Sequence, residues 1–158
     1  GMAFHKNSYV GRTFIKPKQS MREQSVKIKL NVLKENVKGK RIIMVDDSIV
    51  RGTTIANLIR MLKEAGALEV HVRISSPPFL HPCYFGTDVP SNDQLIAASH
   101  STEEICKMIG ADSLGYMQTD YLEGMAGGLP LCKACFDGNY PMEIPDYTNA
   151  EFADIVKC

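Results

Sequence analysis

The sequence has no excess of charge of either sign and no long apolar run. Lysine and arginine total 18, as do aspartate and glutamate. This balance leaves neither a basic stripe for nucleic acid nor an acidic tail for a basic partner, so we expect neither. The apolar runs extend over only a few residues, and the first six residues lack the apolar core of a signal peptide, so no membrane segment is expected.

A disulfide framework is also absent from the cysteine pattern. The five cysteines are an odd number, and their spacing does not suit a small secreted domain. A reduced, cytoplasmic protein with a metal or cluster site fits this usage better. With 158 residues, of which 44% are hydrophobic and 23% charged, the chain is a globular sequence of one domain or part of one.

The most informative stretch is 41–54, which joins an apolar run to two acids and a short polar loop. Residues 41–45 are short and almost uniformly apolar, which predicts a strand at the centre of a parallel sheet, buried on both faces. Asp46 and Asp47 then fall at the carboxyl end of the strand, where open α/β sheets bind their ligands. A helix is predicted after the loop from the spacing of Ile55, Leu58, Ile59 and Leu62.

The next strand is predicted over 69–75, which completes a right-handed βαβ unit and an α/β fold class with a mainly parallel sheet flanked by helices. Further helices are expected over 21–33, from Ser91 to about Ala98, from Ser101 to Gly110 and over 119–125, with a strand over 114–117. A weak helix is expected near the carboxyl terminus, at Phe152, Ile155 and Val156.

The loop after the acid pair has the composition of a phosphate site. Gly52 allows close approach or a positive φ, Thr53 and Thr54 add hydroxyl donors, and the following helix supplies backbone N–H groups. The two adjacent carboxylates suit neighbouring hydroxyls, or a divalent cation carried by the ligand. A sugar phosphate has groups for both parts of the motif, hydroxyls for the two acids and a phosphate for the loop. The alternative is that the acids only cap a turn and end a solvated strand.

The amino-terminal stretch 1–19 is polar and aperiodic, which predicts a loop. It is also basic, and the stretch is either a solvated, disordered end or a cationic lid over an anion. The basic residues in and just after it are Lys6, Arg12, Lys16, Lys18 and Arg22.

Three cysteines form a second candidate site. Cys132 and Cys135 make a Cys-x-x-Cys pair, and Cys83 directly follows a proline. Such a set can bind zinc or an iron–sulfur cluster, can be redox-active, or can be ordinary thiols, and spacing alone does not choose. Cys106, within a helical pattern, is expected to be structural and Cys158 inert, while His81 is a conceivable substitute ligand beside Cys83.

Several motifs, in order, resemble one family. The segment 45–54 looks like the phosphoribosyl-pyrophosphate motif of type I phosphoribosyltransferases, and in this extended form it resembles amidophosphoribosyltransferase, the family of the first committed step of purine synthesis. The segment 6–15 resembles the flexible catalytic loop of that family. The segments Ser75-Ser76-Pro77-Pro78, Pro82-Cys83 and 132–141 resemble its clostridial and bacillar branch.

The resemblance implies roles for these residues. Ammonia from glutamine would displace pyrophosphate from C1 of phosphoribosyl pyrophosphate and give phosphoribosylamine. Asp46 and Asp47 would serve the ribose hydroxyls and Mg²⁺, and a flexible loop over about 5–20 would close over the substrate. The substrate-binding residues would be Asp46, Asp47, Ser48, Val50, Arg51, Gly52, Thr53 and Thr54, and the loop residues Lys6, Tyr9 and Arg12.

The same resemblance implies a [4Fe–4S] cluster on Cys83, Cys132 and Cys135, with a fourth cysteine supplied from upstream of this chain. Residues 1–126 would be part of the phosphoribosyltransferase domain, containing the substrate motif at 42–54, and 127–158 a cysteine-containing segment. The chain would be the carboxyl-terminal part of the enzyme, working with an upstream glutaminase half and forming a homo-oligomer at full length. The alternative is an inactive regulatory fragment that binds phosphoribosyl pyrophosphate.

Overall fold

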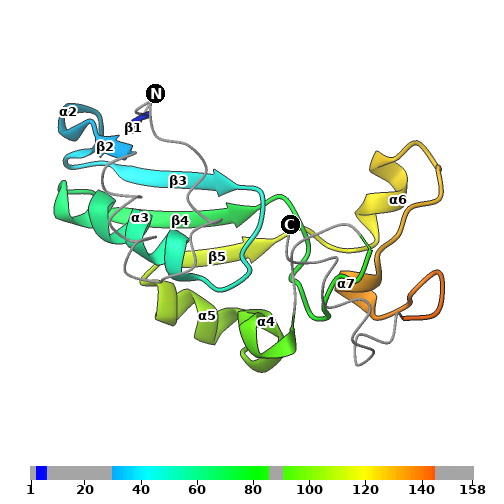
Figure 1. The fold of residues 1–158 in the computed structure, drawn as a ribbon. Helices are drawn as coiled ribbons and strands as arrows, with labels where there is room; N and C mark the ends of the chain where they lie inside the picture. Colours follow the sequence, from blue (N-terminus) through cyan, green and yellow to red (C-terminus); the bar gives the residue numbers. More distant parts are fainter. Residues whose placement is uncertain (1–2, 7–29, 86–90, 145–158) are drawn as a thin grey trace.

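The centre of the fold is a three-stranded parallel sheet of β3 (Arg41–Asp46), β4 (Glu69–Ile74) and β5 (Ser113–Tyr116), in the order β3-β4-β5. The structure is a computed structural model, and it describes residues 3–6, 30–85 and 91–144. The three strands point in one direction, and their carboxyl ends face the side where α4, α6 and α7 lie (Figure 1). The predicted α/β class is thereby confirmed.

Two helices form the main hydrophobic core with the sheet. Apolar side chains of α3 (Thr53–Glu64) and α5 (Thr102–Ile109) pack against those of β4. Each fully buried aliphatic side chain contributes about 1.5–3 kcal/mol relative to exposure, so this layer supplies much of the stability of the fold. The most deeply buried members are Ile59, Leu62, Ile105, Val70 and Val72.

The opposite face of β3 is open, so the prediction of a strand buried on both faces was wrong. Ile43 and Val45 are 71% and 70% exposed, and β3 is an edge strand of the described sheet. The reason is that α3 and α5 pack through side chains of the other face, such as Ile42 and Met44. A uniformly apolar run therefore did not indicate two covered faces within the described part of the chain.

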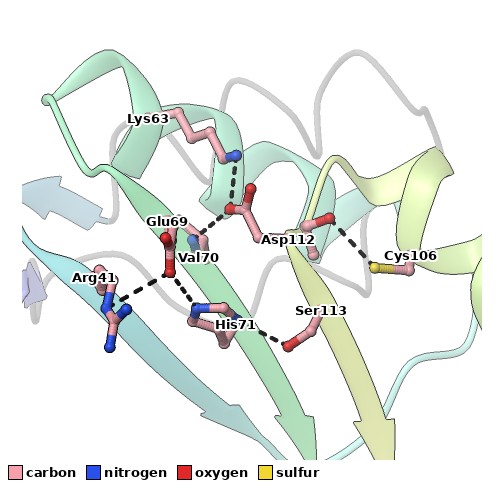
Figure 2. A network of polar contacts seen from close by, with 9 residues as sticks. Arg41, Lys63, Glu69, Val70, His71, Cys106, Asp112 and Ser113 are labelled. Atoms are coloured by element: carbon pink, nitrogen blue, oxygen red, sulfur yellow. Dashed lines mark hydrogen bonds and ion pairs between the residues drawn. The ribbon is translucent and has the colours of Figure 1, made fainter.

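A polar network runs across the open face (Figure 2). The imidazole of His71 contacts the Ser113 hydroxyl at 2.9 Å and the Glu69 carboxylate at 2.8 Å, and Arg41 lies 3.7 Å from that carboxylate. These are cross-strand neighbours, since Arg41 pairs with Glu69 and His71 with Ser113. The network therefore ties the three strands together on the side that has no helix in the described residues.

Asp112 joins the starts of β4 and β5 to the end of α3. Its carboxylate accepts a 2.6 Å hydrogen bond from the Val70 backbone N–H and lies 2.8 Å from the Lys63 ammonium (Figure 2). The bond from Lys63 and the bond from Val70 lower the pKa of Asp112. The carboxylate therefore stays ionised at neutral pH and satisfies a buried backbone donor.

An antiparallel pair of short strands replaces two features expected from the sequence. β1 (Phe4–Lys6) pairs with β2 (Leu30–Val32), and α2 (Lys34–Val37) follows. The predicted helix over 21–33 was wrong at residues 30–33, and its remainder, 21–29, lies outside the described residues. The predicted amino-terminal loop was wrong at residues 4–6. β1 and β2 are far apart in the sequence, so their pairing is not visible in the local pattern of apolar residues.

The remaining helices match the predictions unevenly. At α5, Ser101 Oγ accepts from the Glu104 N–H, and the Ser101 N–H donates to Glu104, so the predicted capping box is confirmed. The helix expected over 91–98 is broken into η1 (Asn92–Gln94) and α4 (Ile96–Ser99), because Leu95 between them is extended and buried. α6 (Tyr121–Met125) falls within the range predicted for it, and α7 (Ala134–Asp137) was not predicted.

The expected terminal helix lies outside the described residues. Within the described ranges, no helix has the length and apolar character needed to cross a membrane.

Candidate phosphate and cysteine sites

The candidate phosphate site lies where β3 ends and α3 begins. Residues 47–52 connect these elements at the carboxyl edge of the sheet (Figure 1). The parallel strands all end at this edge, so groups from several of them converge there. The structure therefore places the acid pair, the short loop and the helix start in one continuous turn.

The two carboxylates of the site differ in environment. Asp46, the last residue of β3, is half-buried, whereas Asp47 is exposed. The Asp47 N–H donates to Asp46 Oδ1 at 3.0 Å, and the Ser48 hydroxyl donates to Asp47 Oδ1 at 2.8 Å. Burial raises the pKa of Asp46, and the charge of Asp47 adds to this effect, while the Asp47 N–H opposes it. A bound cation or a pair of hydroxyl donors would relieve this cost.

Gly52 fixes the start of α3. Its φ of +78° lies in the left-handed region, and a Cβ built there would lie 3.0 Å from Ile96 Cδ1. Its carbonyl accepts the first helical bond, from the Ala56 N–H at 3.0 Å. Thr53 and Thr54 follow with exposed side chains, and the first backbone N–H groups of a helix have no partner within the helix. These donors and the helix dipole suit an anion.

The loop is supported from a segment that the sequence did not connect to it. The Ile96 N–H donates to the Val50 carbonyl at 2.9 Å. Leu95, only 1% exposed, packs with Phe79 and Val50 in a second hydrophobic cluster, separate from the main core. The available signal is the apolar pair Leu95-Ile96 within a polar stretch, which lies inside the helix predicted from Ser91 to about Ala98.

Tyr116 is a further group at this edge that the sequence did not single out. It is the last residue of β5, and its hydroxyl is the buried side-chain oxygen in the described part of the chain that has no hydrogen-bond partner. Burial raises the pKa of Tyr116 to about 12. The hydroxyl therefore remains protonated at neutral pH and is a donor without an acceptor.

The predicted catalytic loop is mostly beyond what the structure describes. Lys6 is the last residue of β1, and nothing is described of its side chain. Tyr9 and Arg12 lie outside the described residues. Their predicted roles over the substrate therefore stay predictions.

The cysteine segments are brought together by backbone bonds and packing. The N–H groups of Leu80 and His81 both donate to the Cys135 carbonyl, at 2.9 and 3.1 Å. Cys83 and Cys135 pack at the second hydrophobic cluster, and the Tyr140 hydroxyl donates to the Pro82 carbonyl at 2.8 Å. Segments far apart in sequence thus place Cys83 beside the Cys-x-x-Cys pair.

The thiols do not form a ready metal site. Burial raises the pKa of Cys135 to about 11, and the neighbouring Cys83 and Cys132 add to this rise. Cys132 is exposed, however, and no group of three His, Cys, Asp or Glu side chains in the described ranges is arranged to hold a metal ion. The geometry therefore supports Cys83 and Cys135 as a pair of neighbouring metal ligands better than it supports all three cysteines as ligands.

Cys106 differs from these cysteines. It lies on α5 and its thiol donates to the Ala111 carbonyl at 3.3 Å (Figure 2). This contact closes the turn after α5 and agrees with the structural role expected for it.

Comparison of the sequence with protein-family models indicates the class of domain that carries the candidate phosphate site. A family model described as the phosphoribosyl transferase domain matches residues 4–75, which include β3, the acid pair, the loop, α3 and β4. The part of the chain that carries the candidate phosphate site is therefore similar to phosphoribosyl transferase domains.

Particular relatives extend the similarity over most of the chain. It is 54% identical over 147 residues to the amidophosphoribosyltransferase of Archaeoglobus fulgidus, covering 89% of this chain and 32% of the relative. It is 53% identical over 148 residues to the amidophosphoribosyltransferase of Bacillus subtilis, covering 88% of this chain and 30% of the relative. The chain thus spans about a third of the length of these relatives.

A solved structure is similar in fold as well as in sequence. It is described as glutamine phosphoribosylpyrophosphate amidotransferase from B. subtilis complexed with ADP and GMP, with a TM-score of 0.76 and 50% identity. The match covers 93% of this chain and 34% of that one. A second structure, described as the allosteric regulatory enzyme of purine biosynthesis, has a TM-score of 0.74 and 49% identity.

Proposed function

We propose that this chain carries the phosphoribosyl-pyrophosphate site of an amidophosphoribosyltransferase. The observation that carries the proposal is the continuous turn in which the Asp46 and Asp47 carboxylates are followed by the Gly52 bend and the start of α3. One end of this turn offers acceptors for the ribose hydroxyls, and the other offers donors for the 5′-phosphate. Similarity to relatives with this activity supports the same choice of ligand.

The proposed reaction replaces pyrophosphate by ammonia at C1 of the ribose. The C1–O bond breaks and its electron pair leaves with pyrophosphate, a C1–N bond forms, and the attacking ammonia loses a proton. The carbon passes through an oxocarbenium-like state, which requires an oriented ring more than a protein nucleophile. Mg²⁺, when bound, would neutralise charge on the pyrophosphate, and Asp46 and Asp47 are the residues proposed to lie near it. Glutamine is the proposed source of the ammonia.

In this proposal the chain's own residues hold the sugar phosphate at both ends. The acid pair accepts hydrogen bonds from the 2′- and 3′-hydroxyls, and the 5′-phosphate lies against the backbone N–H groups and the hydroxyls of Thr53 and Thr54. Two fixed ends orient C1 and expose one face of the ring to the incoming ammonia. Lys6, Tyr9 and Arg12 are proposed to close over the substrate and exclude water.

Replacing Asp47 with asparagine tests this assignment. We expect the dissociation constant for phosphoribosyl pyrophosphate with Mg²⁺, measured by titration calorimetry, to rise by about 10- to 100-fold, because a hydrogen bond to a charged group contributes about 1.5–3 kcal/mol. Asparagine still accepts the bond from the Ser48 hydroxyl, so the fold should be retained.

The matched control is Asp120→Asn, which removes an exposed carboxylate at the start of α6. It should bind as the unchanged chain does. Absence of binding by the folded, unchanged chain, or equal binding by the Asp47 variant, would overturn the proposed site. Binding without ammonia-dependent turnover, even with the glutaminase half supplied in trans, would instead favour the regulatory alternative.

We further propose that Cys83, Cys132 and Cys135 contribute ligands to a [4Fe–4S] cluster, with the remaining ligand outside this chain. What supports this is the proximity of the two cysteine segments and the effect of Cys83 and Cys132 on the pKa of Cys135. A cluster iron would stabilise the thiolates, offsetting the burial that disfavours them.

Anaerobic reconstitution with iron and sulfide tests the proposed cluster. We expect iron, sulfide and charge-transfer absorbance in the unchanged chain and in Cys106→Ser, and their loss in Cys135→Ser. Cys106 is the suitable control because its thiol contacts only the turn after its own helix among the contacts described for it. Stoichiometric zinc in place of iron, or equal iron in all three proteins, would contradict the cluster.

A further inference from the structure

We infer that Gln94 is a positioning residue for phosphate binding: its side-chain carbonyl holds the guanidinium of Arg51 beside the loop at 50–54. The inference rests on the proposed function, because it says how the guanidinium of Arg51 is held in position at the same phosphate site. Arg51 lies within the loop and Gln94 lies in η1, a separate element, so the contact joins two parts of the chain that are distant in sequence.

The contact itself is a hydrogen bond from Arg51 Nη2 to Gln94 Oε1. Arg51 is exposed, whereas Gln94 is partly buried, so the glutamine is the more restrained of the two. An exposed arginine otherwise samples many rotamers, and ordering it when a ligand binds costs conformational entropy. A partner that restrains the guanidinium in advance reduces this cost.

The segment that carries Gln94 is fixed on the side toward the loop. Leu95, the next residue, is 1% exposed in the second hydrophobic cluster with Val50. Ile96, the residue after that, donates its N–H to the Val50 carbonyl at 2.9 Å. Gln94 and Arg51 are therefore adjacent in sequence to two residues, Leu95 and Val50, that pack together. The packing of Leu95 with Val50 therefore holds the backbones of Gln94 and Arg51 close together, which favours the contact between their side chains.

The chemical nature of Gln94 suits a positioning role. Its amide oxygen is a neutral acceptor, so it orients the guanidinium without neutralising its charge. A carboxylate at this place would form an ion pair and compete with a phosphate. The guanidinium has five N–H donors, and the bond to Gln94 uses one of them, which leaves others for phosphate oxygens.

Two substitutions at position 94 separate orientation from charge. Binding of phosphoribosyl pyrophosphate with Mg²⁺ is measured by titration calorimetry on the whole 158-residue chain, with thermal unfolding measured in parallel. We expect Gln94→Ala to weaken binding about 3- to 10-fold, in line with the loss of one hydrogen bond. Gln94→Glu should weaken it more, because the new carboxylate neutralises Arg51. Asn92→Ala, in the same turn of η1, should bind normally.

A double-mutant cycle shows whether Gln94 acts through Arg51. In an Arg51→Ala background, Gln94→Ala should have no further effect on binding. If Gln94→Ala weakens binding equally in both backgrounds, the positioning role is overturned and the proposed function stands. The same holds if the unchanged chain binds and the variants at position 94 bind with the same affinity. If the folded, unchanged chain does not bind, both are overturned.

Discussion

Replacing Gly52 with alanine is expected to weaken binding of phosphoribosyl pyrophosphate more than about tenfold and to lower the free energy of unfolding by about 2 kcal/mol. Alanine at a φ of +78° is strained by about 1 kcal/mol, and the new Cβ would lie 3.0 Å from Ile96 Cδ1 and 3.5 Å from Ile109 Cγ2. Because the Ile96 N–H holds the Val50 carbonyl, displacement of Ile96 would shift the loop as well. Calorimetry and thermal unfolding measure the two effects.

Gly39 provides a matched control for this substitution. Its φ is +72°, but a Cβ at Gly39 would have no neighbour within 4 Å. Gly39→Ala should therefore show the conformational cost alone, with unchanged ligand binding. Equal losses of stability and of binding in the two variants would show that Gly52 has no special role in the site.

Replacing Leu95 with alanine is expected to lower the free energy of unfolding by about 2–5 kcal/mol and to weaken ligand binding as well. Leu95 is 1% exposed, and truncating a buried leucine loses apolar contacts and leaves a cavity. The cavity would lie in the second hydrophobic cluster, whose members include Val50 of the loop. Urea unfolding gives the stability, and calorimetry under conditions where the variant is folded gives the affinity.

Leu62→Ala separates the two effects. Leu62 is 0% exposed and lies near the end of α3, in the main core. It should lose a similar amount of stability, because the same side chain is removed from a buried position. Its folded fraction should bind the ligand normally. If Leu95→Ala also binds normally, the second hydrophobic cluster does not support the loop.

The β3–α3–β4 unit was predictable because its signals are local. An apolar run, two acids, a glycine and the helical spacing of Ile55, Ile59 and Leu62 lie consecutively in the chain, and each restricts the structure of its own neighbourhood. The position of the acid pair at a strand end followed from the same order of residues. The Ser101–Glu104 capping box was predictable for the same reason, since both partners lie within one turn of a helix.

The features that the sequence did not reveal depend on distant partners. The open face of β3 depends on where the helices pack, and Ile43 has the same apolar character as Ile42 although only Ile42 faces the core. The break at Leu95 arises because that side chain packs against Phe79 and Val50. The contact of Arg51 with Gln94 is likewise invisible to local patterns, because neither residue has a spacing that points to the other.

The second hydrophobic cluster also has a consequence for the order of folding. Its members come from four separated stretches of chain, represented by Val50, Phe79, Leu95 and Phe136, whereas the main sheet forms from consecutive β-α-β segments. Contacts between remote segments require the closure of long loops, which is entropically costly and slow. We therefore expect the second hydrophobic cluster, and with it the full support of the phosphate loop, to be complete only after the Phe136 segment has joined.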